Sequence, residues 1–95
     1  MIFEVVLTQK ANETFDAIRS QVASRWGEAS AAKFEERTWQ VLEIISKYPL
    51  IYQSTEYDKT IRKAHIHKNC SLFYNIRDNK IIVAFFWDNR QEPIF

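Results

Sequence analysis

The sequence predicts an α+β fold: a helical hairpin packed on one face of a small, mostly antiparallel sheet, with the element order β-α-α-β-β-β. Three observations point to it. Two adjacent stretches have apolar residues at helical spacings of three and four, one strand-like stretch precedes them, and three strand-like stretches follow them. The chain is 95 residues long and contains no repeat, so we expect one domain spanning 1–95.

The first strand is predicted over 2–8 and the first helix over 9–26. The strand is rich in β-branched and aromatic residues, and its alternate residues share one apolar face. Gly27, the only glycine, follows the helix at once, where a helix C-terminus commonly takes a left-handed residue without a Cβ. The apolar stripe of this helix, which we expect to pack in the core, consists of Phe15, Ile18, Val22 and Trp26.

The second helix is predicted from about Glu28 to Lys47, with Pro49 just beyond its end. Because a single glycine separates the two helices, we expect them to form an antiparallel hairpin. Residues 50–58 are expected to form an irregular connection. The apolar stripe of the second helix consists of Phe34, Thr38, Val41, Leu42 and Ile45.

Three further strands are predicted over 60–68, 71–77 and 80–87. Asp78 and Asn79 suit a tight turn between the last two strands, since both tolerate a positive φ. The last strand is apolar at almost every position, which is typical of a strand in the interior of a sheet.

Composition limits the class of protein. No apolar stretch approaches the roughly 18–20 residues of a membrane span, and the N-terminus lacks the pattern of a signal peptide. A single cysteine, Cys70, cannot form an internal disulfide. We therefore expect a cytoplasmic protein without a membrane association. The sequence has no Gly-rich phosphate loop, nucleophile motif or zinc spacing, so no cofactor and no metal are expected.

Charge is distributed unevenly along a chain whose net charge is only +1. Residues 1–56 contain 6 Lys/Arg and 8 Asp/Glu, whereas residues 57–95 contain 7 Lys/Arg and 4 Asp/Glu. The second half therefore has the positive balance, and we expect an anionic partner to bind there.

Arg90 is the first candidate functional residue. It comes just after the predicted interior strand, and from that rigid position an arginine can bind a phosphate through two parallel hydrogen bonds. The alternative is a structural role, in which Arg90 forms an ion pair with Asp88 or Glu92.

The stretch 62–68 holds several cationic residues: Arg62, Lys63, His65, His67 and Lys68. Strand alternation places Arg62 and Lys68 on one face and Lys63, His65 and His67 on the other. This stretch is either a surface for phosphate or an acidic partner, or a charged edge strand that discourages aggregation. The two histidines, expected to point the same way, make only half of a metal site; a histidine could also act as a general base.

Trp39 lies off the apolar stripe of the second helix and could face a partner. Tyr74 alternates in phase with Leu72 and Ile76, so we expect it in the core with its hydroxyl bonded. Cys70 has no accompanying histidine and acid in the sequence pattern, and we expect an inert thiol.

The element order resembles the RelE/ParE superfamily, the toxins of type II toxin–antitoxin systems. The resemblance extends over nearly the whole chain. Its stretches are Trp26-Gly27, Phe34 with Leu42 and Pro49, Ile61-Arg62-Lys63, Leu72-Phe73-Tyr74-Asn75-Ile76 and, most specific, Phe86-Trp87-Asp88-Asn89-Arg90-Gln91-Glu92-Pro93.

The resemblance implies a growth-inhibiting toxin that a cognate antitoxin neutralises by wrapping an extended or helical segment over it. RelE-like members cleave mRNA on the ribosome without a metal, and ParE-like members poison DNA gyrase. A homodimer or a toxin–antitoxin hetero-oligomer is compatible with either activity.

Residue by residue, Arg90 matches the arginine after the last strand and Arg62 a strand cation; both are catalytic only in a RelE-like enzyme. Ser71 and Ala64 stand where RelE-like members have basic residues, and the C-terminal tail has no Tyr or His. Proline three residues after Arg90 is ParE-like. The resemblance therefore favours inhibition of DNA gyrase, with a RelE-like mRNA endonuclease or a degenerate interaction module as alternatives. The expected target- or antitoxin-binding residues are Arg62, Lys63, His65, Lys68, Trp39 and Arg90.

Overall fold

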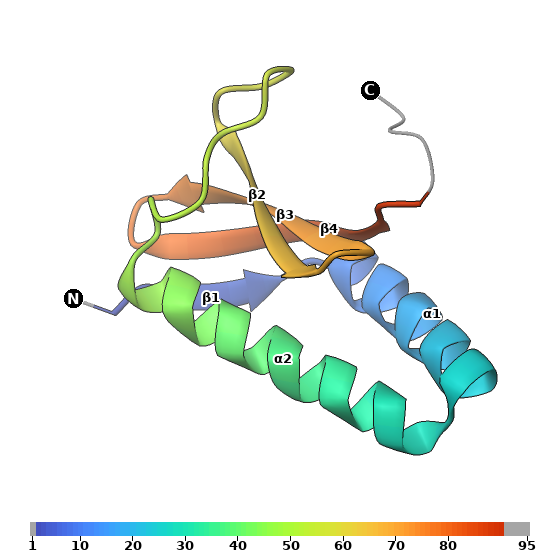
Figure 1. Ribbon diagram of the computed structural model, residues 1–95. Helices are drawn as coiled ribbons and strands as arrows, with labels where there is room; N and C mark the ends of the chain where they lie inside the picture. The colour runs from blue at the N-terminus through green and yellow to red at the C-terminus, as the bar shows by residue number, and fades with distance from the viewer. Residues whose placement is uncertain (1, 91–95) are drawn as a thin grey trace.

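The computed structural model describes residues 2–90, which form a mixed four-stranded sheet with two helices on one of its faces (Figure 1). Strand β1 pairs in parallel with β4, and the other pairs are antiparallel, in the order β1-β4-β3-β2. The predicted fold is confirmed. Its elements are β1 (Glu4–Leu7), α1 (Gln9–Trp26), α2 (Glu28–Lys47), β2 (Ile61–His67), β3 (Cys70–Arg77) and β4 (Lys80–Asp88).

Strand β4 lies in the interior of the sheet, as its apolar sequence predicted, between β1 and β3. The β3–β4 register shifts between Phe73 and Tyr74, so Ala84 is an extra residue on β4. Because of this bulge, Val83 and Phe86 both belong to the core although they are three residues apart. The other buried members of the core are Ala11, Val41, Leu42, Ile45, Ala64, Ile66, Cys70, Leu72, Tyr74 and Ile81.

Strand β1 is shorter than the predicted 2–8 at both ends. At its start, the Phe3 N–H donates to the Ser46 carbonyl at the end of α2 (2.8 Å). At its end, Thr8 caps α1: its Oγ1 accepts from the Ala11 N–H (3.0 Å) and donates to the Ala84 carbonyl (2.8 Å). Thr8 therefore starts the helix and at the same time attaches it to the central strand.

Gly27 alone joins the two helices. Its N–H donates to the Ala23 carbonyl (2.9 Å), and its carbonyl accepts from the Ala31 N–H (3.2 Å). The predicted positive φ is confirmed at 95°, but the ψ of 167° places the residue in the extended positive-φ region, not in the left-handed helical one. That region is almost exclusive to glycine.

We expect Gly27→Ala to lower the free energy of unfolding by about 1–3 kcal/mol. Apart from Gly27 itself and its two neighbours in the chain, no heavy atom lies within 4 Å of the position that a Cβ would take, so the cost is conformational and not steric. Urea denaturation measures it, with Ser24→Ala, an exposed change in α1, as the control that should stay within about 0.5 kcal/mol of wild type. An equal loss in both variants would contradict the role of the glycine.

The connection between α2 and β2 is irregular, as expected, and lies beside the sheet. The Tyr74 hydroxyl donates to the Pro49 carbonyl (2.7 Å), and Arg62 Nη1 donates to the Tyr52 carbonyl (2.7 Å). Further along, the Lys63 N–H donates to Gln53 (3.2 Å), which covers part of the outer edge of β2. Neither α1 nor α2 has the apolar length that crossing a bilayer requires.

Candidate functional site

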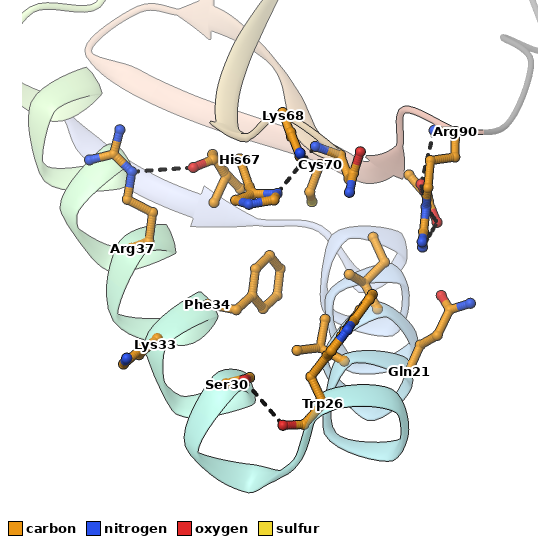
Figure 2. A pocket seen from close by; sticks show the side chains of 15 residues that line it. Gln21, Trp26, Ser30, Lys33, Phe34, Arg37, His67, Lys68, Cys70 and Arg90 are labelled. Carbon is orange, nitrogen blue, oxygen red and sulfur yellow. Dashed lines mark hydrogen bonds and ion pairs between the residues drawn. The ribbon is translucent and has the colours of Figure 1, made fainter.

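A cavity of about 640 Å³ lies between the helical hairpin and the ends of β2, β3 and β4; we call it the hairpin groove (Figure 2). Near the sheet, the helices are packed by aromatic contacts, since Phe15 stacks on Phe34 (5.4 Å between ring centroids) and meets Phe86 edge-on (5.3 Å). The hairpin continues beyond that contact towards Gly27, away from the sheet. The apolar surface of the groove comes from Ile18, Val22, Trp26, Phe34, Ile66 and Cys70.

Trp26 lines the groove and is 56% exposed. The prediction that it packs in the core is therefore wrong. Its place on the α1 stripe is as expected, but it lies in the last turn, where the hairpin has extended past the sheet and no strand covers it. An aromatic side chain left exposed beside a cavity is a candidate contact for a partner.

Basic residues are in excess around the groove. Among the described residues that line it, four are Lys or Arg, one is the histidine His67, and one, Asp88, is acidic. Lys33 and Arg37 come from α2, Lys68 from the turn after β2, and Arg90 from the segment after β4. An apolar floor with a cationic rim suits a ligand that is apolar on one side and acidic on another.

Arg90 forms an ion pair with Asp88, the structural alternative that its sequence left open. Its Nε lies 2.9 Å from Asp88 Oδ1 and its Nη2 lies 2.7 Å from Oδ2, so the Nε–Nη2 edge of the guanidinium is bound by both carboxylate oxygens. The Arg90 N–H also donates to Oδ1 (2.9 Å). The side-chain hydrogen bonds from Arg90 lower the pKa of Asp88, and the Asp88 bonds raise the pKa of Arg90. Glu92, the other proposed partner, lies outside the described residues.

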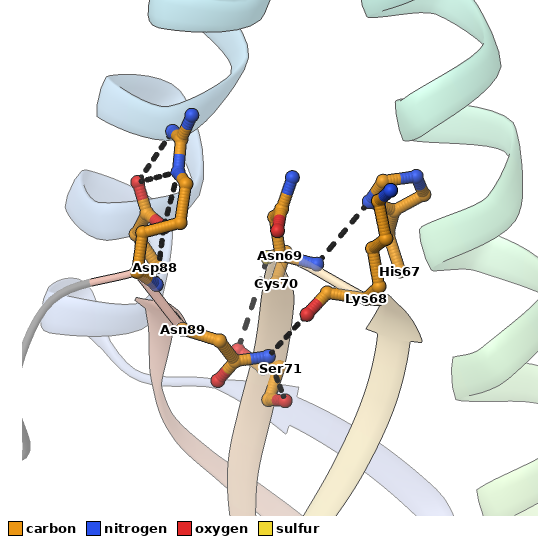
Figure 3. Close-up of polar contacts among 8 residues, drawn as sticks. His67, Lys68, Asn69, Cys70, Ser71, Asp88 and Asn89 are labelled. Atoms are coloured by element: carbon orange, nitrogen blue, oxygen red, sulfur yellow. Dashed lines mark hydrogen bonds and ion pairs between the residues drawn. The ribbon is translucent and has the colours of Figure 1, made fainter.

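The segment that carries Arg90 is fixed by its neighbour Asn89 (Figure 3). The Asn89 N–H donates to the Asn69 carbonyl (2.8 Å), and its Nδ2 donates to Ser71 Oγ (2.9 Å). Ser71 Oγ in turn lies 3.2 Å from His65 Nδ1. Ser71, where the resemblance led us to look for an arginine, is thus part of a structural network that ties the end of β4 to the β2–β3 turn.

The cationic stretch of β2 does not form one surface. A bulge separates His65 from His67: His67 pairs with Cys70 at the groove, whereas His65 pairs with the next residue, Ser71, whose side chain points to the opposite face. The expectation that the two histidines point the same way is therefore wrong. Lys68 lines the groove with His67.

Two other predicted residues of β2 have internal contacts. Arg62 donates to the Tyr52 carbonyl, as described above, and the Lys63 Nζ lies 5.8 Å from the centroid of the Phe73 ring. Neither lines the hairpin groove. Of the sequence-predicted candidates, the structure brings Lys68 and Arg90 together in the groove and leaves Arg62, Lys63 and His65 outside it.

Trp39 marks a separate surface. It is 59% exposed, as its position off the helical stripe suggested, and lines a shallower cavity of about 490 Å³ beside β1 with Val5, Leu7 and Leu42. Trp39 and the hairpin groove therefore belong to different candidate contact surfaces.

Lys33 and Arg37 were missed from the sequence. The available signal was their spacing: Ser30, Lys33, Phe34 and Arg37 are three and four residues apart, so they lie on one face of α2. Arg37 also contacts the sheet, since its Nε donates to the Ile66 carbonyl (3.2 Å).

Within residues 2–90, no group of three or more His, Cys, Asp or Glu side chains is arranged to hold a metal ion. Burial raises the pKa of the Cys70 thiol to about 12, with a smaller contribution from Asp88, so the thiol is protonated at neutral pH. The groove provides apolar area for packing and cations for acidic groups.

Comparison with known proteins places the chain among toxins. A family model described as the ParE toxin of the type II toxin–antitoxin system parDE matches residues 5–93. The sequence matches none of the curated proteins.

Several solved structures share the fold at low sequence identity. A chain of the chromosomal ParDE system of Pseudomonas aeruginosa is 13% identical with a TM-score of 0.79, covering 92% of this chain and 96% of that one. A chain of the RelBE2 toxin–antitoxin complex of Mycobacterium tuberculosis is 14% identical with a TM-score of 0.65, covering 93% and 99%. A mutant toxin of Helicobacter pylori is 14% identical with a TM-score of 0.60, covering 94% and 97%.

Proposed function

The chain belongs to the ParE toxin family of type II toxin–antitoxin systems, and from this premise we propose that it arrests growth by binding DNA gyrase and not by cutting mRNA. The members that this chain resembles act in one of these two ways. The choice between them depends on whether the residues that would cleave RNA come together around one phosphate.

The observation that carries the proposal is that Arg62 and Arg90, the two arginines that the resemblance assigns to RNA cleavage, do not share a cavity and are both engaged internally. Metal-free RNA cleavage requires an acid, a base and a cationic clamp within reach of one scissile phosphate. Arg62 is bonded to the Tyr52 carbonyl, and Arg90 is paired with Asp88. Ser71 and His65 bond to each other away from the groove. This arrangement favours a protein that acts through its surface over one that acts through a reaction.

A cognate antitoxin is the second part of the proposal. Two of the similar folds come from a ParDE system and from a RelBE2 toxin–antitoxin complex, and the hairpin groove is suited to such a partner. An amphipathic segment could bury its apolar face against Val22, Phe34 and Ile66, with acidic residues near Lys33 and Lys68. Because gyrase acts on the bacterial chromosome, the proposed place of action is the cytoplasm.

Two assays on the purified protein test the proposal. In a supercoiling assay with gyrase, ATP and relaxed plasmid, we expect supercoiling to stop and cleaved DNA to accumulate. In a reconstituted translation reaction, we expect the mRNA to stay intact. Expression in cells should accordingly induce the DNA-damage response.

The variant tested in both assays is Arg90→Ala, because Arg90 would contribute both to gyrase binding and to mRNA cleavage. Codon-positioned mRNA cuts that vanish in this variant would show a RelE-like endonuclease. Unimpaired supercoiling together with intact mRNA would contradict both activities and indicate a degenerate toxin that retains only protein contacts.

A further inference from the structure

The cations of the hairpin groove are not equivalent. Lys33 and Arg37 lie on the α2 side, and within residues 2–90 no acidic side chain forms an ion pair with either of them or with Lys68. Arg90 lies on the α1 side, opposite α2 in Figure 2, and is paired with Asp88. Among the residues that line the groove, one rim therefore has free positive charge, and the other has a pair whose net charge is zero. Arg25 of α1 does not line the groove, but its charge also acts on Asp88 and helps to lower the pKa of that carboxyl.

The Asp88–Arg90 pair is held firmly enough to count as one neutral unit. Asp88 accepts from Nε, from Nη2 and from the backbone N–H of Arg90, and the Asn89 bonds to Asn69 and Ser71 fix the backbone between them. The Asp88 side chain is 12% exposed and that of Arg90 is 39% exposed, so the carboxylate is the better shielded of the two partners. An acidic group that approaches this rim meets a guanidinium whose charge Asp88 already balances and whose Nε and Nη2 are already bonded to Asp88, so that Nη1 is the nitrogen still available.

The backbone around the groove favours a helical occupant. The Ile66 carbonyl, at the groove end of β2, already accepts from Arg37, and the outer edge of β2 near Lys63 is covered by the segment at Gln53. An added strand would need free backbone groups there. A helix forms its backbone hydrogen bonds internally, so it needs only apolar contact and charge complementarity from the groove.

We propose that the hairpin groove binds an amphipathic helix whose acidic residues lie on one flank, the flank that faces Lys33 and Arg37, and that Asp88 sets this preference by neutralising Arg90. The proposal rests on the antitoxin role inferred above and adds the charge pattern of the bound segment. Asp88 acts here as a specificity-determining residue. Because the acidic flank must face α2, the position of that flank on the helix also sets the direction in which the helix lies in the groove.

Two synthetic amphipathic helices of identical composition test this. Both have the same apolar stripe and four glutamates; one peptide has all four on one flank of the stripe, and its isomer has two on each flank. On the wild-type protein, the one-flank peptide should bind about tenfold more tightly, since two glutamates of the isomer would face the neutral pair and lose their ion pairs with the groove.

The variants separate Asp88 from a general charge effect. In Asp88→Asn, Arg90 becomes free, and the ratio of the two affinities should fall from about tenfold to about one. In the double variant Asp88→Asn with Arg90→Gln, the rim is neutral again and the ratio should return to about tenfold. Glu35→Gln is the matched control, because it breaks an ion pair with Arg19 (2.6 Å) and does not line the groove, so the wild-type ratio should persist.

Circular dichroism and urea denaturation of each variant establish that it is folded before affinities are compared. Equal binding of the two peptides to wild type, or a ratio that Asp88→Asn leaves unchanged, overturns the assignment of Asp88. If neither peptide binds, the groove is not the helix site. That failure is distinguishable from a failure of the gyrase proposal, which the supercoiling assay reports independently.

Discussion

Replacing Phe86 by alanine should lower the free energy of unfolding by about 3–5 kcal/mol, the usual cost of deleting a buried phenyl ring. Phe86 is 2% exposed on the central strand β4 and meets Phe15 of α1 edge-on, with the ring centroids 5.3 Å apart. Its backbone N–H also donates to Thr14 Oγ1 of the same helix (2.9 Å). The residue thus joins the sheet to the hairpin.

Urea denaturation at neutral pH measures this change, with Trp39→Ala as the control. Trp39 is a larger aromatic residue but lies on the surface, so its loss should cost less than about 1 kcal/mol. A domain of this size has roughly 5–15 kcal/mol of stability in total, so this loss should raise the unfolded fraction by about a hundredfold or more, and growth inhibition should weaken as the protein becomes less abundant in cells. Similar costs for the two variants would mean that the helix–sheet interface is not the centre of the core.

The helices could be predicted to the residue because their ends are marked chemically. Gly27 supplies the positive φ between the helices, and Pro49 follows the end of α2. Thr8, predicted as the last residue of the first strand, supplies the cap hydroxyl at the start of α1. These signals are local in sequence, so no knowledge of the tertiary structure was needed. The observed strand ends differ from the predicted ones by one or two residues because they depend on partners distant in sequence. One example is the Ser46 carbonyl, which accepts from the Phe3 N–H.

The faces of the strands were harder to predict. A simple alternation placed His65 and His67 together, but the bulge between them shifts the register and sends them to opposite sides. The second bulge, next to Tyr74, allows both Val83 and Phe86 to reach the core. The position of such a bulge depends on how the side chains of neighbouring strands pack together. Nothing in the local sequence marks it.

The candidate site was predicted only in part, because it is built between elements. Lys68 and Arg90 were identified from the sequence and do line the groove, but Lys33 and Arg37 acquire significance only once α2 is placed beside the ends of β2 and β4. Arg90 was proposed both as an anion-binding residue and as a structural one. Its pairing with Asp88 means that an acidic partner must compete with an internal carboxylate for this arginine.

This distinction bears on how the protein would select its partners. A free arginine at the end of β4 would attract any phosphate or carboxylate, including nucleic acid, at the mouth of the groove. With Arg90 paired, the unpaired charge of the groove is on α2 and the β2–β3 turn, beside the apolar surface of Phe34 and Ile66. A ligand then benefits from combining apolar and acidic groups, which is typical of an amphipathic protein segment and not of a polyphosphate chain.

Stability should fall steeply in alkaline solution, between about pH 9 and pH 12. Burial raises the pKa of Cys70 from 9.0 to about 12, and burial also raises the pKa of Tyr74 from 10.0 to about 12, although Arg62 opposes the second shift. Both groups are neutral in the folded protein and ionise more readily in the unfolded chain. Their contribution to stability is therefore complete below the unfolded pKa values and is lost as the pH rises towards the folded ones.

Urea midpoints measured from pH 7 to pH 12 on wild type and two variants test this dependence. Cys70→Ala should remove the part of the decline that begins near pH 9, and Tyr74→Phe the part that begins near pH 10, where the thiol and the phenol ionise in the unfolded chain. Tyr74→Phe should also be less stable at pH 7, because its hydroxyl no longer donates to the Pro49 carbonyl. If wild type and both variants decline in parallel above pH 9, other groups such as the lysines cause the alkaline unfolding, and neither buried side chain is the cause.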